Sequence, residues 1–489
     1  MISRTPRKSD RTVGLADSAP LKLHAANSKV GSLARLPMRG RTYRCGKETV
    51  AQLELLHNIP APYRVHLFNC LSRSLEARGD SLHVHFFGAN NPDRPASWQR
   101  SLEDARFSYK VWDGYPIRVR GTTLWLNPSL VWNLARRRPD VLLHGGVWDS
   151  VTSLLAVMLA RPRRRIAWME FNVDIPGRSS GVVGRAKRAL LLRSNHLLVP
   201  GRKGLRYLEQ YMGDELLSRA VVLPNVVDES RFSTQISKED RARARAAVGA
   251  ETLSGSDRLL LWPARLIGHK GILEFLQHVD RTALDGLAIR IIGEGPLRRE
   301  VLHAIEDRGL AGRVSLVDGY VDYRQMPAIY RASDALLLPS LHDPNPLSVV
   351  EALHSGLPML LSNRVGNFEE ALAEGQNGFG FDPLDGNQVR TALRRFRDAS
   401  AEELRAMGER SAEIGATAWS SQACVDRAVE AMLGPVTATG AAEHDASRST
   451  GVVVETYRPE PRPLSRRAGS PRMDSQEPVE RDANTLKNS

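Results

Sequence analysis

Short apolar runs alternate with helix-like segments along most of this 489-residue chain, in two successive series. The first series contains six expected strands: Leu53–His57, Leu82–Phe87, Asp140–Leu143, Ile166–Met169, His196–Val199 and Ala220–Leu223. The second contains five: Arg258–Trp262, Ala288–Ile292, Val314–Val317, Ala335–Leu338 and Met359–Leu361. Strands that alternate with helices form parallel sheets with crossover helices. The pattern predicts an α/β protein with two Rossmann-like, doubly wound domains facing a ligand cleft at the carboxyl ends of their strands.

Changes in composition predict the domain boundaries. Residues 1–46 are rich in Arg, Lys, Ser and Pro without sustained periodicity, and residues 435–489 are similarly polar, so both tails are expected to be disordered. The first domain is expected over residues 47–227 and the second over residues 258–414. A polar, Arg- and Ala-rich linker region at residues 228–257 separates them.

Charge and cysteine content limit the class of protein. The net charge of +13 favours an anionic partner such as nucleotide phosphates, nucleic acid or an anionic membrane face. Three distant cysteines, Cys45, Cys70 and Cys424, match no metal spacing and indicate a reducing compartment. The longest apolar stretch, Val151–Ala160, is about half the length of a membrane-spanning helix. We therefore expect a cytoplasmic protein, with peripheral association with the inner face of the cytoplasmic membrane left open.

The segment LWPARLIGHKG, Leu261–Gly271, ends a predicted strand and leads to a helix that starts near Ile272. Arg265 and Lys270 follow the carboxyl end of that strand, where open α/β sheets bind ligands. Two cations near a helix N-terminus suit a pyrophosphate group. Solvent-facing loop charges are an equally weighted alternative.

A second strand, loop and helix occupy residues 336–353, and their loop is rich in proline. Asp343 in this loop is either a turn residue or a carboxylate that holds sugar hydroxyls. The backbone N–H groups near Leu347 and Ser348 suit a phosphate, because they open a helix. In the alternative interpretation, Ser348 and Glu351 form an S-x-x-E capping box, in which Glu351 bonds only its own helix.

A third strand-to-helix turn, IIGEGPL at residues 291–297, contains Gly293 and Glu294. Glycines allow a backbone or a ligand to approach closely. Most such turns only change the chain direction, so this turn alone predicts little.

Together, these segments resemble the retaining glycosyltransferases of family 4 (glycosyl transferase group 1), which have the GT-B fold. The resemblance covers roughly Leu53 to Leu433 and is densest from Leu259 to Phe381. It rests on PARLIGHKG, IIGEGPLRRE, GYVDYRQMPAIYRASDALLLPSLHD, SVVEALHSGLPMLLSN and EGQNGFGF, which occur in the family's order. The family has an acidic pair separated by seven residues, a spacing that Asp343 and Glu351 share, although Glu is usual at the first position.

The resemblance implies a role for each matched residue. Arg265 and Lys270 would hold the donor diphosphate and Asp343 would contact the transferred sugar, which makes these three the catalytic candidates. Glu351 would hold the ribose hydroxyls. The remaining donor-binding candidates are Gly293 and Glu294 in the IIGEGPL turn, Tyr320 and Val321 at the edge of the base, and Leu347 and Ser348 at a phosphate.

The first half of the chain matches less closely. The acceptor-side candidates are Arg64, Gly145 and Glu170, because they follow strands whose carboxyl ends would face the cleft. An equally weighted alternative is that these residues only shape the turns after the strands. Residues 415–434 resemble the family's closing helix, which crosses back to the first domain.

Basic residues in the first half suggest a membrane surface. They comprise the Arg161–Arg165 run and a helix with Arg185, Lys187, Arg188, Arg193 and the leucines Leu190–Leu192. This set could dock on anionic lipid. An ordinary amphipathic helix with its leucines in the core is the slightly favoured alternative.

The resemblance implies a retaining, metal-independent hexosyltransferase that needs no cofactor. Its donor would be a UDP- or GDP-sugar and its acceptor a glycan or lipid-linked sugar, in polysaccharide or glycolipid biosynthesis. A non-catalytic sugar-nucleotide-binding or scaffold protein with the same fold is the alternative. A nicotinamide-dependent dehydrogenase is disfavoured, because Ile59–Pro62 replaces the expected G-x-G-x-x-G. Nucleic-acid binding is also disfavoured, because no recognisable motif accompanies the charge.

Overall fold

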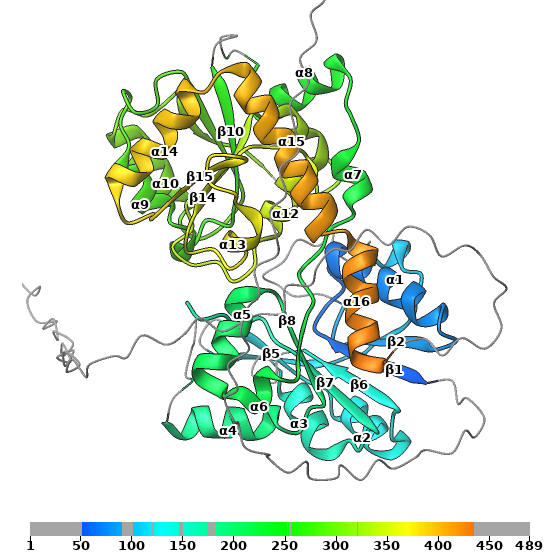
Figure 1. The fold of residues 1–489 in the computed structure, drawn as a ribbon. Helices are drawn as coiled ribbons and strands as arrows, with labels where there is room; N and C mark the ends of the chain where they lie inside the picture. The colour runs from blue at the N-terminus through cyan, green and yellow to red at the C-terminus, as the bar shows by residue number, and fades with distance from the viewer. Residues whose placement is uncertain are drawn as a thin grey trace, which may run out of the picture. The chain divides into compact units, whose positions relative to one another are not determined.

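The computed structural model describes residues 51–89, 101–119, 122–145, 150–174, 179, 181–251, 253, 257–319 and 321–434. The tails predicted at residues 1–46 and 435–489, and the candidate Tyr320, lie outside the described residues. Two parallel sheets, each flanked by helices, make up the described chain (Figure 1). The predicted α/β class with two Rossmann-like domains is confirmed.

The first sheet has the strand order β3-β2-β1-β6-β7-β8-β9, and all its pairs are parallel. Its strands are β1 (Gln52–His57), β2 (Ser81–Phe86), β3 (Ser108–Val111), β6 (Val141–His144), β7 (Arg164–Trp168), β8 (His196–Val199) and β9 (Ala220–Val222). Leu53 pairs with Leu82 on one side and with Val141 on the other. The sequence pattern missed β3 and a separate antiparallel hairpin, β4 (Tyr115–Val119) and β5 (Thr122–Leu126).

The second sheet has the strand order β12-β11-β10-β13-β14-β15, also parallel throughout. Its strands are β10 (Arg258–Pro263), β11 (Leu287–Ile292), β12 (Val314–Leu316), β13 (Ala335–Leu338), β14 (Met359–Ser362) and β15 (Gly378–Phe381). The strand order reverses between β10 and β13. In doubly wound sheets, ligands bind at such a switch point, beyond the carboxyl ends of the strands.

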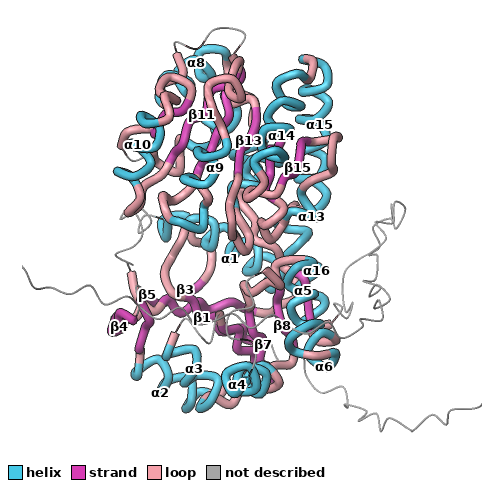
Figure 2. The backbone as a smooth tube through the Cα atoms, turned by 90° about the vertical axis from the view of Figure 1, so that its left-hand side faces the viewer, coloured by secondary structure: helices cyan, strands magenta, loops and turns pink. Residues whose placement is uncertain are grey.

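Helices cover both sheets (Figure 2). Around the first sheet they are α1 (Pro62–Glu76), α2 (Pro128–Arg137), α3 (Val151–Leu159), α4 (Gly181–Leu191), α5 (Arg202–Tyr207), which continues into a π-helical turn (Leu208–Met212), and α6 (Asp214–Leu217). With the second sheet belong α7 (Glu229–Ser233), α8 (Lys238–Ala247), α9 (Ile272–His278), α10 (Arg298–Asp307), α11 (Met326–Ala332), α12 (Leu347–His354), α13 (Phe368–Ala371), α14 (Gly386–Asp398) and α15 (Ala401–Ala418).

The chain passes between the sheets twice. After β9 it continues into α7 and α8, which pack against α12 and α11, so the expected linker region contains two packed helices. After α15 it returns as α16 (Ser421–Leu433), which packs against α1 (Figure 1). No helix in the described part of the chain is long and apolar enough to span a bilayer.

Polar contacts join the two passages. The backbone N–H of Ser421, at the start of α16, donates to Glu229 Oε1 at 3.2 Å, and Glu229 begins α7. His66 on α1 contributes its Nε2, which lies 3.0 Å from Ser421 Oγ and 3.7 Å from Glu229 Oε2. The His66 imidazole therefore contacts the first residues of both α7 and α16, the two helices at which the chain crosses between the domains.

Candidate functional site

A cavity of about 420 Å³ lies beyond the carboxyl ends of β10 and β13 and is lined by residues of both domains. This is the switch point of the second sheet, where the topology favours a ligand. Seven of the candidate residues line it: Glu170, Arg265, Lys270, Asp343, Leu347, Ser348 and Glu351. The loops after the two strands converge here, although they lie more than 70 residues apart in sequence.

Lys270 and Asp343 form an ion pair in this cavity, with Lys270 Nζ donating to Asp343 Oδ2. The Lys270 side chain is only 16% exposed, so the alternative of a solvent-facing loop charge is wrong for this residue. Arg265 is exposed and lines the same cavity. The site thus brings two cations and one largely buried carboxylate together, beside the first turn of α12.

Glu351 lies on α12, and its carboxylate accepts a hydrogen bond of 2.6 Å from Tyr330 Oη. The capping-box alternative is wrong, because α12 begins at Leu347 after Pro346 and Ser348 is already inside the helix. Burial raises the pKa of Glu351 to about 7, and the hydrogen bond from Tyr330 limits the rise. Glu351 is therefore a buried carboxyl poised between its two protonation states at neutral pH.

Asn345 was not singled out from the sequence, yet it lines the cavity beside Asp343. Its side-chain Oδ1 and Nδ2 are both buried and have no hydrogen-bond partner within the part of the chain that the structure describes. Buried polar atoms without partners are costly and mark places where a ligand or water completes the structure. Only the three-dimensional contacts could reveal this, since an Asn in a Pro-rich loop is an ordinary turn residue.

The first domain contributes Glu170, whose side chain is 54% exposed and lines the cavity. Its partner is Arg64, which is buried and forms an ion pair with the Glu170 carboxylate. The Arg64 guanidinium also lies 4.4 Å from the Trp168 ring centre and donates to Asn225 Oδ1 at 3.0 Å. Arg64 therefore sits behind the cavity wall and holds Glu170, whereas Glu170 itself faces the cleft.

Four other candidates are not among the residues that line this cavity: Gly145, Gly293, Glu294 and Val321. A Cβ on Gly293 would lie 1.9 Å from the Ala264 carbonyl oxygen, so this glycine is required where two loops pack together. Glu294 takes part in the same packing, because its carbonyl accepts from Leu266 N at 3.0 Å. The IIGEGPL turn thus supports the loop that carries Arg265.

The fold and the cavity define a class: two-domain α/β proteins with a cleft suited to a phosphate-containing ligand. Two cations, the N–H groups that open α12 and the carboxyl groups of Asp343 and Glu351 occur together at the switch point.

Comparison with known proteins narrows this class. The family model described as "Glycosyl transferases group 1" matches residues 247–413. A 2-deoxystreptamine N-acetyl-D-glucosaminyltransferase from Streptomyces fradiae is 28% identical over 149 residues, which cover 29% of this chain and 34% of that protein. A glycogen synthase from Mycobacterium tuberculosis is 26% identical over 283 residues, which cover 54% of this chain and 61% of that protein. The chain thus spans less than two thirds of either relative.

Solved structures show the same fold over a longer stretch. The crystal structure of Anabaena HepE in complex with UDP and glucose superposes with a TM-score of 0.61 at 16% identity, covering 78% of this chain and 98% of that one. Residues 247–413 therefore match the group 1 glycosyltransferase family, and the described chain has the GT-B fold.

Proposed function

We propose that this chain transfers a sugar from a nucleoside diphosphate sugar to a glycan or lipid-linked acceptor, with retention of anomeric configuration. The observation that carries the proposal is the Lys270–Asp343 ion pair in a cavity that Arg265, Glu351 and the first turn of α12 also line. Those groups match the parts of such a donor: sugar hydroxyls, two phosphates and a ribose.

Donor binding would exchange the partners of the ion pair. The diphosphate would pair with Lys270 and Arg265, and the sugar hydroxyls would donate hydrogen bonds to the Asp343 carboxylate. Neither the Lys270 charge nor the Asp343 charge would then be left buried and unpaired. Negative charge then grows on the leaving diphosphate oxygen as the anomeric carbon separates from it. The two cations and the N–H groups at Leu347 and Ser348 are already in place to stabilise that charge.

We propose that no metal ion is needed, because Arg265 and Lys270 supply the positive charge that a metal would bring to the diphosphate. The donor is proposed to carry uridine or guanosine. The complex of Anabaena HepE with UDP and glucose supports uridine first. Activity that persists in EDTA would agree with the proposal, and activity restored only by Mg²⁺ or Mn²⁺ would contradict it.

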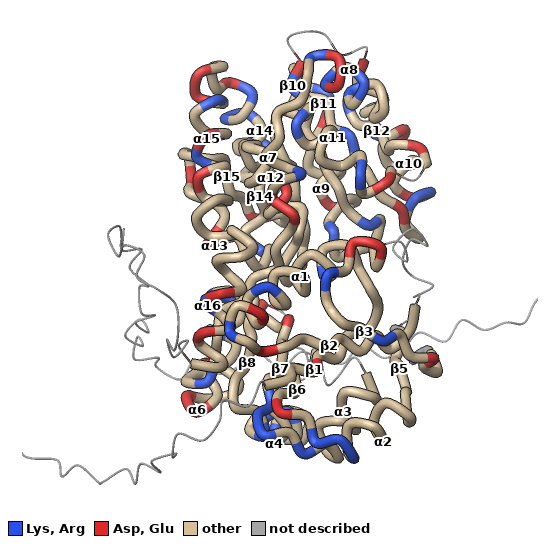
Figure 3. Tube along the Cα trace, turned by 90° about the vertical axis from the view of Figure 1, so that its right-hand side faces the viewer, with Lys and Arg blue, Asp and Glu red and all other residues tan. Residues whose placement is uncertain are grey.

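The acceptor side is proposed to be the cleft wall at Glu170, and the relatives that act on glycans support a role in polysaccharide or glycolipid biosynthesis. A lipid-linked acceptor would bring the chain to the anionic inner face of the cytoplasmic membrane as a peripheral protein. Figure 3 shows Lys and Arg gathered around α4. Exposed apolar side chains lie nearby on α2, α3 and α4: Trp132, Met158, Leu159, Val182 and Val183.

One residue of the predicted basic helix, Lys187, cannot contact a lipid surface. Lys187 is buried, and its Nζ donates to Tyr207 Oη at 3.1 Å and lies 3.7 Å from the centre of the Phe171 ring. Leu191 is also buried, as the amphipathic alternative predicted. A lipid-facing surface would therefore use Arg185 and Arg193, which are exposed. Replacing both by Gln is expected to abolish flotation with anionic vesicles, and unchanged flotation would exclude this surface.

A turnover assay separates the enzyme from a non-catalytic sugar-nucleotide-binding protein. We expect the purified chain to release nucleoside diphosphate slowly from one nucleotide sugar, even with water as the acceptor, and Arg265→Ala to lower that rate about a hundredfold or more. Binding of the nucleotide sugar without any release, with or without a panel of glycan acceptors, would favour the scaffold alternative.

A further inference from the structure

The loop of residues 343–346, which carries Asp343 and leads into α12, cannot satisfy its own backbone. Pro344 and Pro346 have no N–H group, so the loop has few donors for its four consecutive carbonyls. Buried carbonyls nevertheless need hydrogen-bond donors. The donors for this loop must therefore come from other segments of the chain.

Two of the four carbonyls are served by the second domain itself. The Asp343 carbonyl accepts from Gly366 N at 2.8 Å. The Pro346 carbonyl accepts from Asn367 Nδ2 at 3.2 Å and from Val349 N, in the first turn of α12, at 3.3 Å. Gly366 is required at this contact, because a Cβ there would lie 1.5 Å from the Pro344 carbonyl oxygen. The segment after β14 thus supports both ends of the loop.

The two middle carbonyls are served by the first domain. The Pro344 carbonyl accepts from Asn172 Nδ2 at 3.3 Å, and the Asn345 carbonyl accepts from Asn225 Nδ2 at 3.4 Å. Both asparagines are more than nine-tenths buried. They follow β7 and β9, so they are fixed to the first sheet.

Each asparagine is oriented by a hydrogen bond to its side-chain oxygen, Oδ1. Asn225 Oδ1 accepts from Arg64 Nη1 at 3.0 Å, which turns its NH₂ group toward the loop. Asn172 Oδ1 accepts from the backbone N–H of Asp174 at 3.1 Å, with the same result. The first domain therefore holds the two NH₂ donors in position. The second domain carries the loop that accepts their hydrogen bonds.

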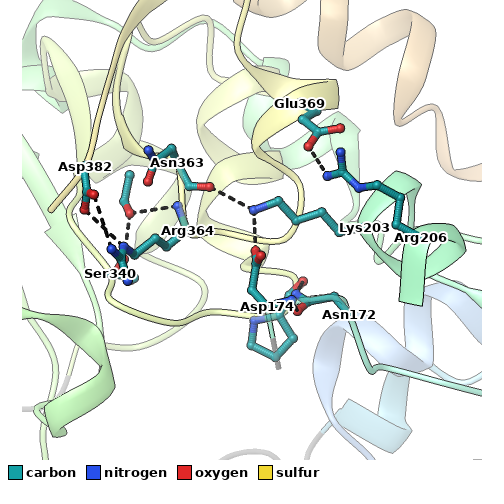
Figure 4. A network of polar contacts seen from close by, with 11 residues as sticks. Asn172, Asp174, Lys203, Arg206, Ser340, Asn363, Arg364, Glu369 and Asp382 are labelled. Carbon is teal, nitrogen blue, oxygen red and sulfur yellow. Dashed lines mark hydrogen bonds and ion pairs between the residues drawn. The ribbon is translucent and has the colours of Figure 1, made fainter. Parts of the chain in front are cut away.

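Further polar contacts near Asn172 link the two domains (Figure 4). Lys203 Nζ, on α5 of the first domain, donates to Asp174 Oδ2 at 2.6 Å and to the Asn363 carbonyl of the second domain at 2.8 Å. Arg206 pairs with Glu369. The segment that holds the ends of the 343–346 loop is itself held by the first domain.

We propose that Asn172 and Asn225 are positioning residues that order the 343–346 loop across the cleft, so that approach of the two domains completes the Asp343 part of the site. Opening of the cleft removes the donors of the two middle carbonyls and loosens the loop together with the first turn of α12. The role in sugar transfer rests on the proposed function, whereas the ordering of the loop does not.

Hydrogen–deuterium exchange of the ligand-free full chain tests this directly. In Asn172→Ala/Asn225→Ala, we expect amides of residues 343–350 to exchange about tenfold faster than in the unmodified chain, with β14 unchanged. The Lys203 hydrogen bonds go to Asp174 and to the Asn363 carbonyl, both outside the loop, and Lys203→Met is expected to act in the same direction by releasing the neighbouring ion pair. Asn69→Ala is the matched control, because the Asn69 amide hydrogen-bonds Asp104 and Arg106 within the first domain, and it is expected to leave the exchange of the loop unchanged.

The outcomes separate the two proposals. Unchanged loop exchange in both the double variant and Lys203→Met would overturn the positioning role, whatever the chain catalyses. Faster loop exchange in a chain that neither binds nor cleaves any nucleotide sugar would support the positioning role and contradict the proposed function. If both proposals hold, the double variant lowers kcat for donor cleavage more than it raises KM, because the loop is ordered for the step after binding.

Discussion

We expect donor binding to depend on pH near neutrality through Glu351, because burial raises the pKa of its carboxyl to about 7. The ionised carboxylate accepts hydrogen bonds from ribose hydroxyls on both oxygens, whereas protonation turns one of these oxygens into a donor and removes the charge. With that pKa, about 9% of the groups are ionised at pH 6 and about 91% at pH 8. We therefore expect the Kd of the donor nucleotide to fall about tenfold between pH 6 and pH 8.

The sign of this dependence is diagnostic. His269 also lines the cavity, and burial together with the nearby Lys270 charge lowers its pKa below the ordinary value. Protonation of His269 at low pH would favour an anionic ligand, which is the opposite trend. A Kd that falls as pH rises therefore reports Glu351.

Isothermal calorimetry at pH 6, 7 and 8 measures the effect. We expect Glu351→Gln to bind weakly with a flat pH profile. Tyr330→Phe removes the hydrogen bond that limits the pKa rise, so its profile moves to higher pH. Glu294→Gln, outside the cavity, is the control and keeps the full dependence. A flat profile in the unmodified chain, or the same slope in Glu351→Gln, would refute the role of Glu351 at the ribose.

Three further predictions follow from the ion pairs. Lys270→Met is expected to weaken nucleoside diphosphate binding about 10- to 100-fold, measured by calorimetry, because a charge-assisted hydrogen bond contributes about 1.5–3 kcal/mol; equal affinity would contradict the phosphate role. Burial alone would lower the pKa of His66, but hydrogen bonds to Cys70 and to Glu229 raise it to about 9. Burial alone would raise the pKa of Glu229, but hydrogen bonds with His66 and Ser421 lower it to about 2. The His66 contribution is complete below its unfolded pKa near 6.5 and is lost as pH rises through 9, and that of Glu229 is complete above about 4.5 and is lost as pH falls through 2. The Tm is therefore expected to fall by about 2–4 °C from pH 6.5 to pH 9, and a drop that persists in His66→Gln would have another source. Lys203→Met is expected to lower the free energy of unfolding by about 1–3 kcal/mol in urea, and no change would mean that its two contacts contribute nothing net.

The fold could be predicted from the sequence because its strands are buried on both faces. Buried parallel strands are continuous apolar runs, and the eleven expected strands all overlap strands of the structure. The missed strands lack that signal. β3 (Ser108–Val111) is a sheet-edge strand with exposed side chains, and β15 (Gly378–Phe381) alternates glycine with phenylalanine.

The position of a site residue could be predicted from the sequence only where the residue directly follows a strand that ends at the switch point. Asp343 and Lys270 follow strand ends at the switch point, so topology alone brings their loops together. The pKa of Glu351 was not predictable, because it depends on burial and on Tyr330, 21 residues away. The contact of Asn172 with the 343–346 loop spans 172 residues and links two domains, and no local pattern encodes such a contact.

The central claim is that the cleft is a nucleotide-sugar site, and calorimetry with a donor panel tests it most directly. UDP-, GDP- and ADP-sugars would each be titrated in EDTA into the unmodified chain and into Lys270→Met. We expect one nucleotide series to bind, and its affinity to fall at least tenfold in the variant. No binding by any donor, or equal binding by both proteins, would contradict the assignment of this cleft.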